Sequence, residues 1–286
     1  MIPKRSAQRR RARFVAMTVM LACGAVAALG AQGTQARRDT TTTSAGTPLF
    51  TSRDGTLLMG AALATIEVAH FDTKIARYTQ TASVQGDSSR LRLVKRLTKA
   101  NETTLTAAAL VGYGLGRVLH SPGITDVSAH VGEALLITNI TSQAIRGPFG
   151  RARPYVSHDA QNSDFHIRKG FTSYDYRSMP SLHSASAFAA AAALTAEVGE
   201  RHPSAALPVG LVLYSAATIP GLTRMYLDQH WASDVVMGAF LGAFIGHKVV
   251  THAHANPRNR LDRMLLHASV APDAHGGTAL GLAWKM

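Results

Sequence analysis

Cysteine is almost absent from this chain, whose 286 residues include only one, Cys23. A single cysteine excludes an intrachain disulfide and a cysteine-rich metal centre. Aromatic residues are also scarce, at 6% of the sequence, which is few for the strands of a β-sandwich. The hydrophobic fraction of 46% therefore comes mainly from small and aliphatic residues. This composition favours closely packed helices and predicts an all-α fold.

Acidic residues are missing from the first 30 positions, which carry six of the lysine and arginine residues. Nearly half of the net charge of +13 therefore lies in this short segment. The rest of the chain is mildly basic and contains no nucleic-acid-binding motif. We therefore expect an anionic substrate or a membrane surface as partner, and no nucleic acid.

The basic run leads into an apolar segment, Phe14–Gly30, which has the form of a secretory signal with small residues after it. We predict that residues 1–30 direct export, with cleavage near Ala27 to Ala31, although the segment is also long enough to remain as an anchor. The expected location is the bacterial periplasm or the cell-envelope membrane. Cys23 lies in this segment, so no thiolate nucleophile is expected in the mature chain. Residues 31–54 are polar and rich in threonine, which is typical of a linker.

Six apolar segments with helical periodicity follow and predict a six-helix bundle over residues 55–255. They lie at about 56–70, 103–119, 127–146, 183–199, 204–220 and 231–252. Residues 88–100 are charged and predict a further surface helix. Glycines and alanines spaced four residues apart in two of the segments predict close approach of two helices. Residues 256–286 are expected to form an irregular tail with a single short strand near its end.

The relation of this bundle to a membrane is left open by the sequence. A spanning helix needs about 20 apolar residues, and only residues 178–196 and 203–223 approach that length without a charge. A compact periplasmic bundle and a membrane bundle of short helices are both compatible with these segments.

Three stretches at the ends of apolar helices concentrate reactive side chains: Arg146–Pro154, Met179–Ser184 and Thr223–Asp234. Arginine stays charged and donates to two phosphate oxygens at once, so guanidinium groups here suit a phosphate. We expect Arg146, Arg153 and Arg224 to bind the phosphate oxygens, with Ser181 adding a hydroxyl donor. Because arginines can neutralise these oxygens, we predict phosphoryl transfer without metal or cofactor.

The histidines of these stretches suggest the chemistry. His230 and Asp234 are four residues apart, so on one helix the carboxylate could accept the Nδ1 proton and leave Nε2 as a nucleophile. His183 would then protonate the leaving oxygen and later activate water.

The spacing of the three stretches resembles that of the type 2 phosphatidic acid phosphatase (PAP2) and haloperoxidase superfamily. That family's pattern is K-x6-RP, PSGH and SR-x5-H-x3-D, and this chain reads R-x6-RP, PSLH and TR-x5-H-x3-D. The resemblance implies a six-helix core, phosphate binding by Arg146, Arg153, Ser181, Arg224 and the backbone N–H of Leu182, and a His230 nucleophile oriented by Asp234. It also implies acid–base work by His183. Leu182 replaces the family's glycine and adds bulk near the pocket.

These observations predict an exported phosphatase acting on a lipid phosphate, such as phosphatidate or a polyprenyl diphosphate, with its site on the non-cytoplasmic side. Three alternatives remain: a soluble class A-type acid phosphatase, a vanadate-dependent haloperoxidase using the same pocket, and a non-catalytic phosphate-binding bundle. Arg151 and Arg168 are interpreted as surface or rim charges. His252 and His254 are interpreted as solvated helix-end residues, because no third metal ligand has a suitable spacing. Phe171, Tyr174 and Tyr176 are interpreted as loop packing.

Overall fold

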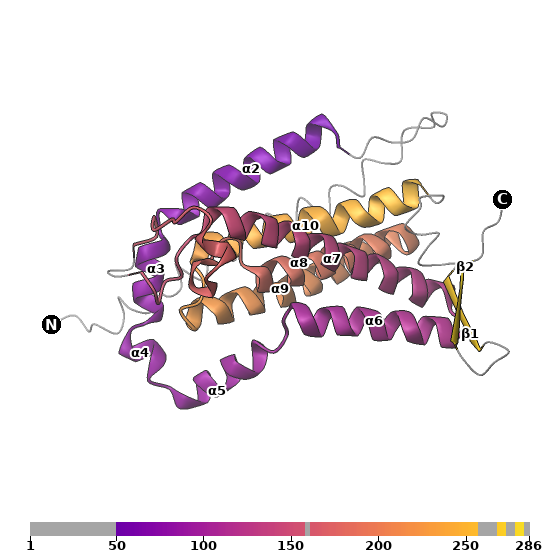
Figure 1. Cartoon of the computed structure of the whole chain (residues 1–286), viewed down its shortest axis with the longest axis horizontal. Helices are drawn as coiled ribbons and strands as arrows, with labels where there is room; N and C mark the ends of the chain where they lie inside the picture. The colour runs from indigo at the N-terminus through magenta and orange to yellow at the C-terminus, as the bar shows by residue number, and fades with distance from the viewer. Residues whose placement is uncertain (1–49, 158–160, 257–267, 273–277, 283–286) are drawn as a thin grey trace.

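The computed structural model describes residues 50–157, 161–256, 268–272 and 278–282. Six long helices lie lengthwise along the molecule (Figure 1) and confirm the predicted all-α bundle. They are α2 (Ser52–Ala69), α6 (Glu102–Val118), α7 (Pro122–Phe149), α8 (Leu182–Arg201), α9 (Pro203–Tyr226) and α10 (Ala232–Ala255). Three shorter helices join α2 to α6: α3 (Asp72–Thr79), α4 (Ala82–Gln85) and α5 (Ser88–Leu97). Helix α5 is the predicted surface helix.

Helix α2 begins three residues before the expected start of the folded region. Thr51 and Asp54 form a capping box, in which the Thr51 backbone N–H donates to Asp54 Oδ2 at 2.7 Å. This cap satisfies N–H groups that the first turn of a helix leaves unpaired, and so fixes the start at Ser52. The predicted signal segment and most of the predicted linker lie outside the described residues.

Helix α8 packs against α7, α9 and α10 at the centre of the bundle. The predicted close approach is found between α8 and α10, where glycines of α10 lie against the α8 backbone. A Cβ added at Gly242 would lie 2.0 Å from the carbonyl oxygen of Ala185, and one at Gly246 would lie 2.3 Å from that of Ala189. Only glycine fits at these two positions, because any side chain would push the two helices apart.

Consecutive long helices alternate in direction, so three C-terminal ends and three N-terminal ends meet at the same end of the bundle (Figure 1). We call this the motif end, because α7 and α9 finish there and α8 and α10 begin there. The opposite end holds the last turns of α6, α8 and α10 and the first turns of α7 and α9.

The C-terminal region differs from the expected single strand. Strand β1 (Ala268–Pro272) pairs antiparallel with β2 (Thr278–Leu282), with Ala268 opposite Leu282 and Pro272 opposite Thr278. A lone strand would leave its backbone N–H and C=O groups without partners in the sheet, and the hairpin supplies them.

Candidate active site

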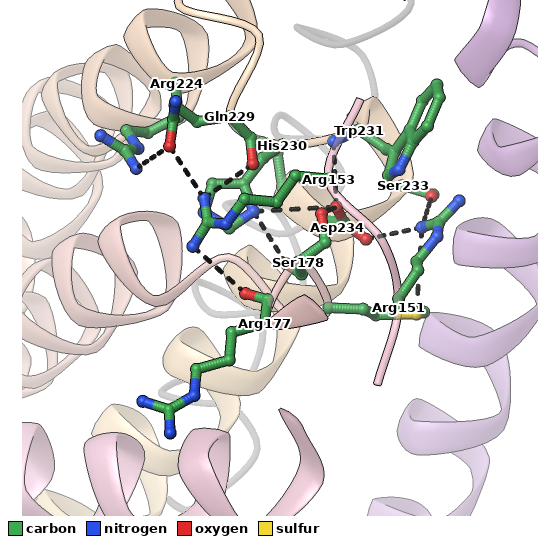
Figure 2. A network of polar contacts seen from close by, with 12 residues as sticks. Arg151, Arg153, Arg177, Ser178, Arg224, Gln229, His230, Trp231, Ser233 and Asp234 are labelled. Carbon is green, nitrogen blue, oxygen red and sulfur yellow. Dashed lines mark hydrogen bonds and ion pairs between the residues drawn. The ribbon is translucent and has the colours of Figure 1, made fainter. Parts of the chain in front are cut away.

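The structure brings all eight predicted site residues to the motif end. Arg146 lies in the last turn of α7, and Arg153 follows in the segment after it. Ser181, Leu182 and His183 start α8, Arg224 ends α9, and His230 and Asp234 flank the start of α10. Figure 2 shows Arg153 at the centre of this network, between Gln229 on one side and Arg177 on the other.

Two of the arginines predicted to bind phosphate donate to one backbone carbonyl. Arg146 donates to the Arg177 oxygen through Nε at 2.9 Å and Nη2 at 2.6 Å, and Arg153 Nη2 donates to the same oxygen at 3.4 Å. Both side chains are buried, and no carboxylate pairs with either among the described residues. Burial lowers the pKa of Arg153, and the nearby Arg224 lowers it further. Two adjacent buried cations favour binding of an anion.

The third arginine completes this group through a glutamine. Gln229 Oε1 accepts from Arg153 Nη1 and from Arg224 Nη2, both at 3.1 Å (Figure 2). In the described part of the chain, Arg224 Nε and Ser181 Oγ are buried without a hydrogen-bond partner. Such atoms gain most from an incoming ligand, and phosphate oxygens could accept from both. No sequence motif identified Gln229 as a site residue.

A hydrogen bond and burial keep His230 as a neutral imidazole in which Nε2 can act as a nucleophile. Nδ1 lies 2.7 Å from the backbone carbonyl of Ser178, and because a carbonyl can only accept, Nδ1 carries the proton. Nε2 is then the acceptor in the neutral ring. Burial lowers the pKa of His230 well below its usual value of 6.5, and the nearby Arg153 adds to this effect while Asp234 opposes it. The ring is therefore uncharged at neutral pH.

The prediction of a direct hydrogen bond between His230 and Asp234 is wrong. It required both residues to lie on one helix, but α10 begins at Ala232. His230 Nδ1 lies 3.7 Å from Asp234 Oδ2, an electrostatic contact beyond hydrogen-bond distance. Asp234 is the third residue of α10, where its side chain caps the helix by accepting from the Trp231 N–H at 2.9 Å.

Asp234 reaches His230 through an intermediate residue. Ser178 Oγ donates to Asp234 Oδ2 at 2.5 Å, while the backbone carbonyl of Ser178 accepts from His230. The Ser181 N–H also donates to the Asp234 backbone oxygen at 2.9 Å. Asp234 thus holds the segment that orients His230, rather than the imidazole itself.

The interpretation of Arg151 as a surface or rim charge is also wrong, whereas Arg168 is exposed as expected. Arg151 is 3% exposed, and its two Nη atoms donate to Asp234 Oδ1 at 2.5 Å and to Asp72 Oδ2 at 2.8 Å. Ser233 donates to Asp72 as well, through its backbone N–H at 2.9 Å. The two carboxylates raise the pKa of Arg151 against the effect of burial. This network ties α3 to the start of α10.

Neither Arg151 nor Asp72 could be recognised from spacing, because 79 positions separate them. The same holds for Glu102 in the first turn of α6, whose Oε2 lies 3.4 Å from His183 Nδ1. Burial and the nearby Arg224 lower the pKa of His183 to about 4, and Glu102 opposes them by favouring the protonated imidazole that a general acid needs.

Leu182 is buried, and the loop aromatics occupy different surroundings from those expected. The Leu182 side chain is buried, and only its backbone N–H, at the first position of α8, remains suited to an anion. Tyr174 lies with its ring 4.0 Å from the Arg153 guanidinium, yet it is 56% exposed, and Phe171 is 58% exposed. Loop packing alone does not account for these two exposed rings.

Comparison with known proteins agrees with the motifs. Residues 128–258 match the sequence model of the PAP2 superfamily. A lipid A 1-phosphatase from Porphyromonas gingivalis is 39% identical over 69 residues, which make up 24% of this chain and 15% of that protein. A transmembrane PAP2-type phosphatidylglycerolphosphate phosphatase from Bacillus subtilis has 16% identity and a TM-score of 0.48, covering 71% of this chain and 97% of that structure.

The region that matches the PAP2 superfamily model contains the three motifs and helices α8 to α10. The matched part of the chain spans about 15% of the length of the lipid A 1-phosphatase. Asp72 and Glu102, which contact Arg151 and His183, lie outside the matched region.

Proposed function

We propose that this protein is a phosphatase that hydrolyses a lipid phosphomonoester or diphosphate, such as phosphatidate or a polyprenyl diphosphate. The observation that carries the proposal is the neutral His230, whose protonated Nδ1 leaves Nε2 as the nucleophilic atom, beside three arginines at the motif end. The name of the curated relative, a lipid A 1-phosphatase, supports a lipid phosphate as substrate.

In this proposal, three arginines bind the phosphoryl group. Arg146, Arg153 and Arg224 neutralise its oxygens, and the buried Ser181 hydroxyl adds a donor. In phosphoryl transfer, positioning and charge neutralisation supply most of the rate enhancement. Fixed guanidinium groups can supply both, so we propose that the reaction does not require a metal ion.

The reaction proceeds in two displacements. His230 Nε2 attacks phosphorus, the ester P–O bond breaks, and His183 gives its proton to the departing oxygen. Water then attacks the phosphohistidine, His183 takes a proton from that water, and the N–P bond breaks to release phosphate. Glu102 holds His183 in place for both proton transfers, and Asp234, 3.7 Å away, stabilises the positive charge that develops on His230.

A lipid substrate is supported by apolar side chains that remain exposed on four helices. Each of α2, α6, α7 and α9 has at least two that are more than half exposed, among them Leu63, Ile66, Leu110, Val111, Leu136, Ile140, Leu211 and Val212. Soluble monomers rarely expose so much apolar surface. Helices α9 and α10 are also long and apolar enough to cross a bilayer. We propose that the bundle is embedded in the membrane with the motif end at its surface.

The alternating direction of the helices limits how the bundle can be oriented in a membrane. Ser52, at the start of α2, lies at the end opposite the motifs. A cleaved export signal would deliver Ser52 to the non-cytoplasmic side, and a spanning bundle would then place the motif end in the cytoplasm. A cleaved signal and a non-cytoplasmic site are therefore compatible only in a bundle that does not span. An embedded bundle with a non-cytoplasmic site requires Ser52 to lie in the cytoplasm, so for that arrangement we expect extraction only with detergent and an N-terminal segment that does not cross the membrane ahead of α2.

Phosphate release by the purified chain tests the proposed activity. The substrates are phosphatidate, a polyprenyl diphosphate and p-nitrophenyl phosphate, each assayed with EDTA present. We expect release from a lipid substrate, lost in His230→Ala and kept in the matched variant His252→Ala at the opposite end. No release from any substrate would contradict the proposal, and preference for p-nitrophenyl phosphate without any need for detergent would favour a soluble acid phosphatase.

A further inference from the structure

Three helices bring two histidines and a glutamate together at the opposite end of the bundle. His130 lies on α7, Glu197 on α8 and His254 on α10. Glu197 Oε1 contacts both His130 Nδ1 and His254 Nε2, the latter at 3.2 Å. The ligand atoms that the three residues can offer all lie within 4.8 Å of one another. No step of the proposed reaction uses this cluster, which lies at the far end of the helices from His230.

The donor set is one that zinc uses. Two imidazole nitrogens and one carboxylate oxygen, at bond lengths of about 2.0–2.2 Å, leave a fourth tetrahedral position for water. Most of the cluster is shielded from solvent, since the side chains of His130 and Glu197 are 6% and 2% exposed and that of His254 is 29% exposed. The more exposed His254 gives an ion a path of entry.

The surrounding charges also favour a cation. Arg201 forms an ion pair with Glu197 Oε2, so the other oxygen, Oε1, is the one that faces the two imidazoles. Arg201 also lies 3.6 Å from Asp126, one turn before His130. Asp126 and Glu200 act on His254 as negative charges. Three carboxylates against one guanidinium leave an excess of two negative charges, which a divalent ion neutralises.

We propose that His130, Glu197 and His254 bind a divalent transition-metal ion of the zinc class, which joins α7, α8 and α10 at the end opposite the phosphate site. Residue spacing could not predict this site, because Glu197 is 67 positions from His130 and 57 from His254. His252 is not part of this site, although it lies two residues from His254, since its Nδ1 faces the Asn256 side chain at 3.2 Å.

Zinc binding to the purified full chain, freed of metal with a chelator, tests this proposal. Isothermal titration with zinc chloride should show one ion per chain, and zinc should raise the thermal midpoint. The visible spectrum of bound cobalt(II) should report tetrahedral coordination. In His254→Ala, loss of a ligand should weaken binding at least about tenfold and remove the thermal shift. The matched variant His252→Ala should bind zinc as the unchanged chain does.

Two results would overturn the proposal: no zinc binding by the unchanged chain, or equal binding by His254→Ala. His254→Ala is the primary variant because its side chain is partly exposed, and Glu197→Gln, which changes a buried group, serves only as a second variant. Phosphate release should be the same in His254→Ala and the unchanged chain. Loss of catalysis and loss of metal binding can therefore be told apart.

Discussion

The two ends of this helical bundle collect charges of opposite sign around histidines. At the motif end, three arginines surround a neutral imidazole: Arg146, Arg153 and Arg224 around His230. At the opposite end, carboxylates exceed guanidinium groups beside His130 and His254. Histidine itself does not distinguish the two ends, because both contain it. The excess charge decides whether each end suits an oxyanion or a metal cation.

The largest expected effect is a loss of stability on replacing Arg151, a buried cation that pairs with two carboxylates at the motif end. Arg151→Met leaves Asp72 and Asp234 buried without their partner, which should cost about 3–5 kcal/mol of unfolding free energy. Chemical unfolding monitored by circular dichroism measures this cost. The matched variant Arg168→Met, at an exposed arginine, should change stability by no more than about 0.5 kcal/mol. Equal stability of the two variants would contradict the assignment.

Replacing Arg153 tests whether the arginines of the motif end that lack a carboxylate partner within the described ranges bind the phosphate. Arg153→Ala removes donors that the transition-state oxygens need, and should lower kcat/KM for phosphate release about 10²–10³-fold. Arg168→Ala should retain full activity, since that side chain is exposed. If Arg153→Ala kept more than about a tenth of the activity, the arginines would not be the phosphate site.

Glu102→Gln probes the partner of the general acid and should have a smaller effect. Loss of the carboxylate beside His183 Nδ1 should lower kcat about tenfold for a lipid phosphate, whose leaving alkoxide needs a proton. The rate with p-nitrophenyl phosphate should change little, because its leaving group departs without one. A uniform loss for both substrates would indicate a structural role for Glu102 instead.

The smallest expected effect is a displaced pH profile. Because the pKa of His230 is held well below 6.5, the nucleophile stays unprotonated as pH falls from 7 through 6.5. We expect protonation of His230 to cause no loss of kcat/KM across that window and to lower it only at lower pH. The unfolded chain, with an ordinary histidine, takes up protons below 6.5, so stability should decrease as pH falls past that value. A half-maximal kcat/KM at pH 6.5 or above would contradict a buried neutral His230.

Local patterns predicted the six long helices and the residues that meet at the motif end. Apolar periodicity is a property of neighbouring positions, and the helices it predicted begin and end within six residues of their observed bounds. The close contact of α8 and α10 followed from the spacing of Gly242 and Gly246.

Contacts between distant segments could not be predicted in this way. The partners of Arg151, His183 and His130 lie on other helices, and no spacing rule connects them. The error over Asp234 has a different origin. It came from placing the start of α10 two residues early, which turned a helix cap into a histidine partner.

In the proposed mechanism, His230 carries the phosphoryl group during turnover. Rapid acid-free quenching of the chain with a 32P-labelled lipid phosphate, followed by peptide mass spectrometry, tests it most directly. We predict a base-stable, acid-labile phosphate on His230 that disappears on chase with unlabelled substrate. Label on another residue, or steady phosphate release with no labelled protein at any time, would contradict the account.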